Sequence, residues 1–192
     1  MPVKMELKSR TNGVNKMKWF LIGAYAACIP LANWMIANIG SCVPNGPCVI
    51  DIAPGYSAPS GVLIIGISLV LRDAVQMVFG WKWGLGSILI GALVSYALAP
   101  PYIVIASVAA FVLSELIDFL VYTPLARKRL VAALILSGIV GAVVDSAIFL
   151  NIAFGSLNFI EGQIIGKIYG VIAASVAILI IRKVYFSRSG VV

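Results

Sequence analysis

The stretch LVAALILSGIVGAVVDSAIFLNIA, residues 130–153, decides the fold class of this chain. Its only charged residue is Asp145. An α-helix needs about 20 predominantly apolar residues to cross the roughly 30 Å hydrocarbon core of a bilayer, and this stretch is long enough. It therefore predicts a membrane-spanning helix.

The rest of the chain repeats this pattern. Hydrophobic residues make up 61% of the sequence and charged residues 11%, and the mean hydropathy is +1.06, which excludes an ordinary soluble globular domain. We expect an all-α membrane protein with six transmembrane helices. These helices form a single domain at 17–182. A basic segment at 1–16 precedes this domain, and a tail at 183–192 follows it. The apolar runs that predict these helices are Met17 to Asn38, Gly61 to Gly80, Gly84 to Ala99, Pro101 to Thr123, Leu130 to Ala153 and Gly162 to Ile181.

Basic residues outside the spans predict the orientation, because loops rich in Lys and Arg stay in the cytoplasm. They lie before the first span, between the second and third, after the fourth and at the C-terminal end, and the intervening loops carry none. We therefore expect both termini to be cytoplasmic, in a bacterial-type inner (plasma) membrane. Topology explains the net charge of +7, so no nucleic-acid partner is expected, whereas contact with membrane lipid is. The residues are Lys4, Lys8, Arg10, Lys16, Lys18, Lys82, Arg127, Lys128, Arg129, Arg182, Lys183 and Arg188.

The loop at 39–60 contains two cysteines, Cys42 and Cys48, on either side of a Pro-Asn-Gly sequence typical of a turn. In an oxidising exterior these thiols can form a disulfide. A zinc site is disfavoured because the chain has no histidine and a closed site needs four ligands.

Six ionisable residues lie inside the predicted spans, where a charge is costly and usually marks a substrate, ion or proton path. Their depths along the helices predict two ion pairs, one between Arg72 and Glu115 and one between Asp145 and Lys167. Asp73 and Asp118 are then left over. Such carboxylates either take up protons, which would couple uptake to a proton gradient, or accept hydrogen bonds from a ligand. A structural hydrogen-bond network between helices is the alternative.

At the level of short segments, the chain resembles the queuosine precursor transporter family (YhhQ-like; VUT, for vitamin uptake transporter). The resemblance extends over nearly the whole chain and depends on the order and spacing of several short segments. They are Asn33-Trp34, Leu71-Arg72-Asp73 with Phe79-Gly80, Ser114 to Asp118 with Val121-Tyr122, Ser137-Gly138, Val144-Asp145-Ser146, Ala153-Phe154 and Lys167.

The resemblance implies an importer of 7-cyano-7-deazaguanine or 7-aminomethyl-7-deazaguanine for queuosine salvage, similar in fold to the substrate-binding subunits of energy-coupling-factor vitamin transporters. A guanine-like base offers N–H donors to a carboxylate and a flat face to an aromatic ring. The implied substrate-binding residues are Asn33, Trp34 as a stacking surface, Asp73, Asp118, Asp145 and Lys167. Common family members carry neutral residues at the positions of Arg72 and Glu115, so this pair is interpreted as a structural ion pair. The negative excess inside the membrane favours the cationic aminomethyl compound.

Three alternatives remain, one of which is a purely structural membrane subunit. A substrate-binding subunit of an energy-coupling-factor transporter would need an ATP-driven partner complex. An intramembrane enzyme is disfavoured because the chain has no histidine and no G-x-S-x-G sequence, so we expect no catalytic residue, no metal and no cofactor. A homo-oligomer is compatible with the sequence.

Overall fold

Six helices make up most of the structure. The computed structural model describes residues 2–42, 46–99, 101 and 103–188, with side chains from 19 to 181 in these ranges. Each helix contains a segment long and apolar enough to cross a membrane, which confirms the prediction of six spans to within a few residues. The helices are α1 (Pro2–Asn38), α2 (Val62–Phe79), α3 (Trp81–Leu98), α4 (Val104–Ala126), α5 (Leu130–Phe154) and α6 (Ile160–Arg188).

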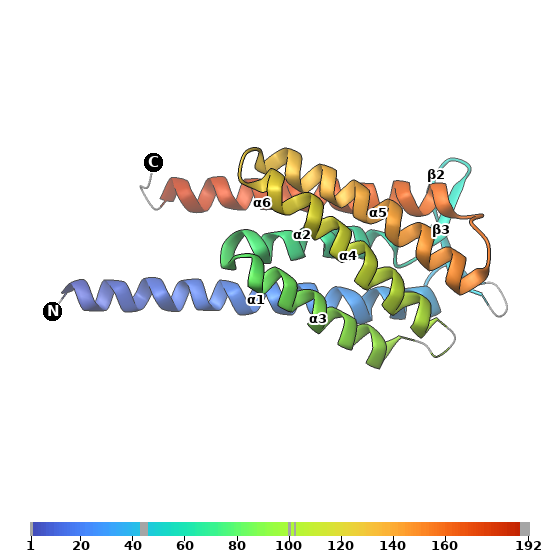
Figure 1. Cartoon of the computed structure of the whole chain (residues 1–192), viewed down its shortest axis with the longest axis horizontal. Helices are drawn as coiled ribbons and strands as arrows, with labels where there is room; N and C mark the ends of the chain where they lie inside the picture. The colour runs from blue at the N-terminus through green and yellow to red at the C-terminus, as the bar shows by residue number, and fades with distance from the viewer. Residues whose placement is uncertain (1, 43–45, 100, 102, 189–192) are drawn as a thin grey trace.

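The helices run alternately up and down, so that both ends of the chain lie at one end of the bundle (Figure 1). We call this the terminal end, and the opposite end, where the strands lie, the sheet end. Helix α2 is central, since it packs against all five other helices. Residues carried by α2 are therefore the most enclosed in the molecule, and it holds two of the six intramembrane charges.

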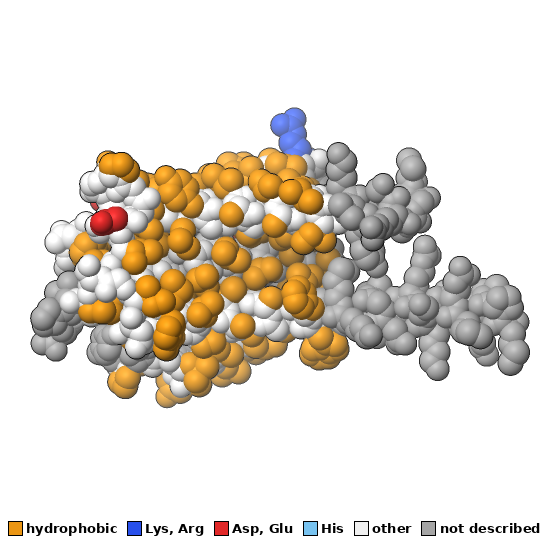
Figure 2. Space-filling view, turned by 180° about the vertical axis from the view of Figure 1, so that it is seen from behind, with side chains coloured by type: hydrophobic (Ala, Val, Ile, Leu, Met, Phe, Trp, Pro, Cys, Tyr) orange, Lys and Arg blue, Asp and Glu red, His pale blue; other side chains and the backbone are white. Residues whose placement is uncertain are grey.

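The surface between the two ends is apolar (Figure 2). Among the side chains described, the exposed cations lie at the terminal end and the exposed anions at the sheet end. An apolar belt between charged ends is what a lipid bilayer requires of a multi-pass membrane protein. The cations are Lys82, Arg127, Lys128 and Arg129, and the anions are Asp51 and Glu161.

The side chains of the basic residues near the two termini lie outside the described side chains. Helix α1 begins at Pro2, so the backbone of the predicted segment at 1–16 continues the first span without a break from residue 2. Helix α6 likewise continues to Arg188. The side chains outside the described residues include those of Lys4, Lys8, Arg10, Lys16, Lys18, Arg182, Lys183 and Arg188.

A small antiparallel sheet covers part of the sheet end, where the sequence was interpreted as a loop. Its strands are β1 (Ser41–Cys42), β2 (Cys48–Ala53) and β3 (Tyr56–Pro59), in the order β1-β2-β3. Gly55, at a φ of 80°, turns the chain between β2 and β3. The expected all-α fold class is confirmed, and the segment at 39–60 that was expected to be a loop contains these three short strands. Short alternating strands around a Pro-Gly turn give a much weaker signal than a span does.

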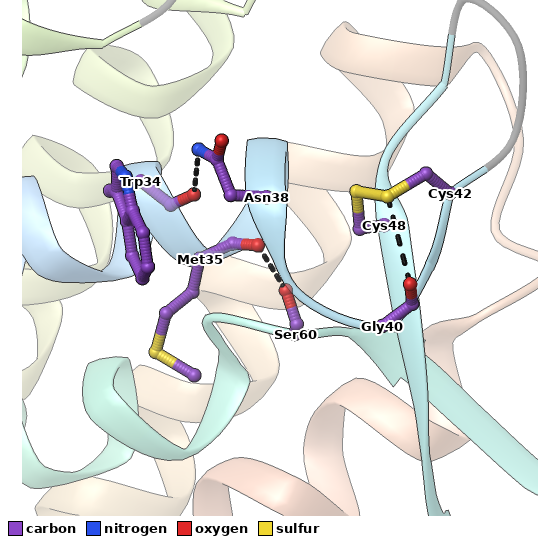
Figure 3. Close-up of a disulfide and its surroundings, with 7 residues drawn as sticks. All are labelled: Trp34, Met35, Asn38, Gly40, Cys42, Cys48 and Ser60. Atoms are coloured by element: carbon purple, nitrogen blue, oxygen red, sulfur yellow. Dashed lines mark hydrogen bonds between the residues drawn. A yellow bond between two sulfur atoms is a disulfide. The ribbon is translucent and has the colours of Figure 1, made fainter.

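Two links fix the sheet (Figure 3). Cys42 and Cys48, opposite one another on β1 and β2, form a disulfide. Ser60 Oγ donates a hydrogen bond to the Met35 carbonyl at 2.6 Å, which joins the end of the sheet to α1. Both β2 and β3 also pack against α6. The sheet is thus held to the helices from which the candidate site is built.

Reduction of the disulfide is expected to destabilise the protein. Closing so short a loop removes chain entropy worth about 2 kcal/mol from the unfolded state. A reductant should therefore lower the Tm of the wild type in detergent and leave the Tm of a Cys42→Ser/Cys48→Ser variant unchanged. An equal effect of the reductant on both proteins would contradict the assignment.

Helices α2 and α6 cross in close contact because both carry glycine at the crossing. A Cβ on Gly66 would lie 2.2 Å from the carbonyl oxygen of Lys167, and one on Gly170 would lie 2.5 Å from that of Leu63. Small residues let helix backbones approach in this way within a membrane. The contact fixes the backbone of Lys167, one of the residues of the candidate site.

Replacing Gly66 by alanine is expected to cost about 1–3 kcal/mol of stability, because the added methyl group has to displace backbone. Thermal unfolding of the purified protein would measure this cost. Gly86→Ala is a matched control, since nothing lies within 4 Å of a Cβ built there. Equal Tm values for the two variants would show that the crossing is looser than described.

Candidate substrate-binding site

A cavity lies among the helices toward the sheet end. It encloses about 500 Å³ of space free of protein atoms, including its open mouth. All six helices and the end of β3 contribute to its walls. The walls are mostly apolar with a few polar groups, as in most small-molecule sites. The polar side chains are Asn33, Ser95, Ser107, Asp145, Gln163 and Lys167.

One wall of the cavity carries an ion pair between α5 and α6. Lys167 Nζ lies 2.6 Å from Asp145 Oδ2, and it also donates to Ser146 Oγ at 2.8 Å and to Gln163 Oε1 at 2.6 Å. An ammonium group has three donors, and all three are engaged. Lys167 therefore holds Asp145 in place and has no further N–H for a ligand unless one of these bonds breaks.

The second oxygen of Asp145 is less engaged. Its one hydrogen bond within the described part of the chain comes from Ser114 Oγ, at a long distance of 3.4 Å. A carboxylate oxygen accepts more than one hydrogen bond. Asp145 Oδ1 is thus the cavity group best able to accept N–H donors from a ligand.

The two adjacent residues Asn33 and Trp34 lie on different sides of α1. Asn33 is 7% exposed and lines the cavity, whereas Trp34 is 55% exposed and is absent from its lining. Successive residues of an α-helix are about 100° apart around its axis, so both cannot face the same cavity. The structure therefore does not bring Trp34 to the candidate site.

Two phenylalanines, Phe111 on α4 and Phe149 on α5, provide the aromatic surface of the cavity instead. The ring of Phe111 contacts Tyr25, with 6.3 Å between centroids, and the ring of Phe149 contacts Phe154 edge-on at 5.9 Å. The sequence interpretation missed both residues. In apolar spans, a phenylalanine at a site looks the same as one facing lipid. Gln163, one helical turn before Lys167, was a detectable signal.

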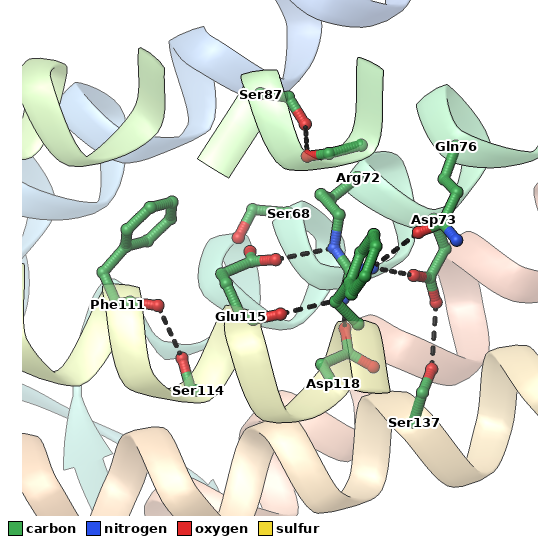
Figure 4. A network of polar contacts seen from close by, with 12 residues as sticks. Ser68, Arg72, Asp73, Gln76, Ser87, Phe111, Ser114, Glu115, Asp118 and Ser137 are labelled. Atoms are coloured by element: carbon green, nitrogen blue, oxygen red, sulfur yellow. Dashed lines mark hydrogen bonds and ion pairs between the residues drawn. The ribbon is translucent and has the colours of Figure 1, made fainter. Parts of the chain in front are cut away.

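A second polar group, which we call the Arg72 cluster, consists of Arg72, Asp73, Glu115 and Asp118 (Figure 4). Arg72 Nε donates to Glu115 Oε2 at 2.8 Å, Nη1 lies 2.9 Å from Asp73 Oδ1, and Nη2 donates to Asp118 Oδ2. All four side chains are almost fully buried, and none lines the cavity. One guanidinium from α2 thus faces three carboxylates, two of them from α4.

This geometry corrects one sequence-based expectation. Asp73 and Asp118 were expected to be left without a counter-ion, but both contact Arg72 together with the expected partner Glu115. The position of each charged residue along its helix correctly predicted which charged groups lie at similar depth in the membrane. It could not show that a single guanidinium, with its five N–H groups, reaches three carboxylates at once.

The cavity and the Arg72 cluster are neighbours along α4 and α5. Ser114, which donates to Asp145, directly precedes Glu115. One turn before Asp145, a Cβ on Gly141 would lie 3.2 Å from Asp118 Cβ. A shift of α4 against α5 would therefore alter both places together.

Comparison with known proteins finds a family match over part of the chain. The model of the family described as putative vitamin uptake transporter matches residues 96–187, which include α4, α5 and most of α6. Over this segment the chain is similar to that family. Together with the six spans, the match indicates a multi-pass membrane protein that is similar, over residues 96–187, to a small-molecule uptake family. No curated protein and no solved structure matches it.

The matched region contains much of the chemistry described above. The matched segment contains Glu115, Asp118, Asp145 and Lys167. Asn33, Arg72 and Asp73 lie before it. Both the cavity and the Arg72 cluster are thus assembled across the boundary of the matched region.

Proposed function

We propose that the protein imports a queuosine precursor of the deazaguanine class, without ATP, and that the cavity binds the base. The single observation that carries the proposal is the cavity itself, in which the Asp145 carboxylate and the Asn33 amide lie among apolar walls with two phenyl rings. The family match supports small-molecule uptake, and the resemblance noted in the sequence supports this substrate class.

The polar groups suit the edge of a guanine-like base. Such a base presents ring N–H and amino donors beside a carbonyl oxygen. In the proposed complex, Asp145 Oδ1 accepts from the donors, and the Asn33 amide donates to the carbonyl. Phe111 and Phe149 offer faces to the flat ring.

The charge of the cavity favours the neutral precursor. Its described lining carries one carboxylate and one ammonium, which already neutralise each other at 2.6 Å. A cationic aminomethyl group would add an uncompensated charge to a mostly apolar site, which costs free energy. The negative excess that pointed to the cationic precursor belongs instead to the Arg72 cluster. We therefore propose 7-cyano-7-deazaguanine as the preferred substrate.

The proposed orientation places the terminal end in the cytoplasm of a bacterial-type inner membrane. The exposed Lys82, Arg127, Lys128 and Arg129 at that end support it. The sheet and the mouth region of the cavity would then face the exterior, where a disulfide persists.

The test is the queuosine content of tRNA in a host that cannot make the precursor, fed either compound, with or without the protein. Restoration by 7-cyano-7-deazaguanine is expected, with weaker restoration by the aminomethyl compound. If a confirmed level of membrane protein restored nothing, the substrate assignment would be wrong.

Asn33→Ala and Trp34→Ala form a matched pair for the same assay. Asn33→Ala is expected to reduce precursor uptake about tenfold, since a hydrogen bond in a dry site contributes on the order of 1.4 kcal/mol. Trp34→Ala is expected to change little, because its side chain lies outside the cavity. The reverse order of effects would place the substrate on the other side of α1.

A further inference from the structure

The Arg72 cluster has an excess of negative charge. One guanidinium faces the carboxyl groups of Asp73, Glu115 and Asp118, and their side chains are at most 1% exposed. If every group were ionised, the cluster would carry two uncompensated negative charges in the membrane interior. Uncompensated charge is costly there, and buried carboxyl groups usually neutralise instead.

The guanidinium cannot satisfy all the carboxylate oxygens. Four hydrogen bonds engage its N–H donors, and Nη1 also lies 2.9 Å from Asp73 Oδ1 as an ion pair without a hydrogen bond. The four acceptors are Gln76 Oε1, Glu115 Oε2, the Glu115 carbonyl oxygen and Asp118 Oδ2. Within the described part of the chain, Asp73 Oδ1, Glu115 Oε1 and Asp118 Oδ1 are buried and have no hydrogen-bond partner. Asp73 Oδ1 at least contacts the guanidinium as an ion pair, so Glu115 Oε1 and Asp118 Oδ1 are the oxygens that need either a proton or an external donor.

The surrounding helices supply no second cation to the cluster among the side chains described. On α5, Ser137 donates to Asp73 Oδ2 at 3.0 Å, and Asp145 is bonded to Lys167 of α6. On α3, Ser87 donates to the Gly84 carbonyl. On α1, the buried Tyr25 hydroxyl is a neutral group without a hydrogen-bond partner in the described chain. Neutral hydroxyl groups do not offset the charge.

A bound metal ion fits less well than a proton. Among the described residues, no group of three or more His, Cys, Asp or Glu side chains is placed to hold a metal. The Arg72 guanidinium occupies the position between the three carboxylates (Figure 4). A proton needs only one oxygen without a hydrogen-bond partner, and Glu115 Oε1 and Asp118 Oδ1 each provide one.

We infer that the Arg72 cluster is a proton-binding site, with Glu115 and Asp118 as the groups that carry exchangeable protons, and that its protonation is coupled to the loading of the cavity. The coupling rests on the proposed uptake function, whereas the proton site does not. Ser114 and Glu115 are consecutive on α4, and Gly141 against Asp118 lies one turn from Asp145 on α5. A ligand that contacts Asp145 can therefore change the position of the cluster residues, because α4 and α5 carry groups of both sites.

The proton site is tested by infrared difference spectroscopy of the purified protein in lipid nanodiscs as the pH is varied. At neutral pH the wild type is expected to show the C=O band of a protonated carboxylic acid in a dry environment. Glu115→Gln and Asp118→Asn should each lose part of this band. Asp51→Asn is the control, since Asp51 is exposed and bonded to Ser57 at 2.7 Å, and should keep it.

The wild-type spectrum alone can overturn the inference, even if a variant fails to fold. A wild type without a protonated-carboxyl band at neutral pH would mean that all three carboxylates are ionised. A band retained in full by both folded variants would place the proton elsewhere.

The coupling is tested in proteoliposomes, where uptake of 7-cyano-7-deazaguanine and internal acidification are followed together. We expect uptake to rise when the exterior is made acidic, and protons to enter with the substrate. If uptake were unchanged by the pH gradient and by an uncoupler, the proposed coupling to protons would be wrong, and the proposed import function would still hold. If no uptake were observed, the proposed function would be wrong, and the infrared experiment would still test whether the Arg72 cluster binds a proton.

Discussion

Replacing Arg72 by glutamine is expected to remove most of the folded protein from the membrane. The substitution leaves Asp73, Glu115 and Asp118 buried together without a cation. Removing one partner of a buried ion pair costs about 3–5 kcal/mol, a large fraction of the stability of a typical domain. The yield of membrane-inserted protein and its Tm in detergent would measure the effect.

Two further variants distinguish the effect of disrupting the Arg72 cluster from a general effect of losing an arginine. Arg127→Gln removes an exposed arginine at the terminal end and should leave yield and Tm nearly unchanged. Adding Asp118→Asn to Arg72→Gln removes one of the buried carboxyl groups that have lost their contact with Arg72, and should recover part of the yield. A stable Arg72→Gln protein would show that the cluster does not hold the helices together.

Replacing Asp145 by asparagine is expected to have the second-largest effect, on both stability and uptake. Lys167 would keep its bonds to Ser146 and Gln163 and lose its counter-ion in a buried position. The cost is again about 3–5 kcal/mol. Uptake should fall more than tenfold, because the acceptor proposed for the N–H groups of the base is lost.

A double variant separates the two roles of Asp145. Asp145→Asn with Lys167→Met removes both charges, and should recover stability because no buried charge is left unpaired. It should not recover uptake, since the carboxylate acceptor is still missing. Glu161→Gln, an exposed change at the start of α6, is the control for both measurements. Full uptake by the double variant would exclude Asp145 from the site.

The fold was largely predictable because lipid imposes one rule on every span. A long apolar stretch such as residues 130–153 has to be a helix, since only a helix satisfies its own backbone in hydrocarbon. The sheet was not predicted because the segment from Cys48 to Pro59 lies outside the spans, where this rule does not hold. There, side chains and a single glycine turn decide the structure.

The site was less predictable, because rotation about a helix axis cannot be read from depth. The depths of Asp145 and Lys167 were enough to predict their pairing, since they lie on consecutive antiparallel helices. Whether Asn33 or Trp34 faces the cavity depends on how α1 is rotated. That rotation is set by packing against α2 and α3, which no local pattern in α1 reveals.

The most direct test of the central proposal is uptake of labelled 7-cyano-7-deazaguanine into proteoliposomes that contain this purified protein alone. The account predicts saturable uptake without ATP, which Asn33→Ala weakens and Trp34→Ala does not. Uptake that appears only when an energy-coupling complex and ATP are added would contradict it. The protein would then be the substrate-binding subunit of an ATP-driven transporter.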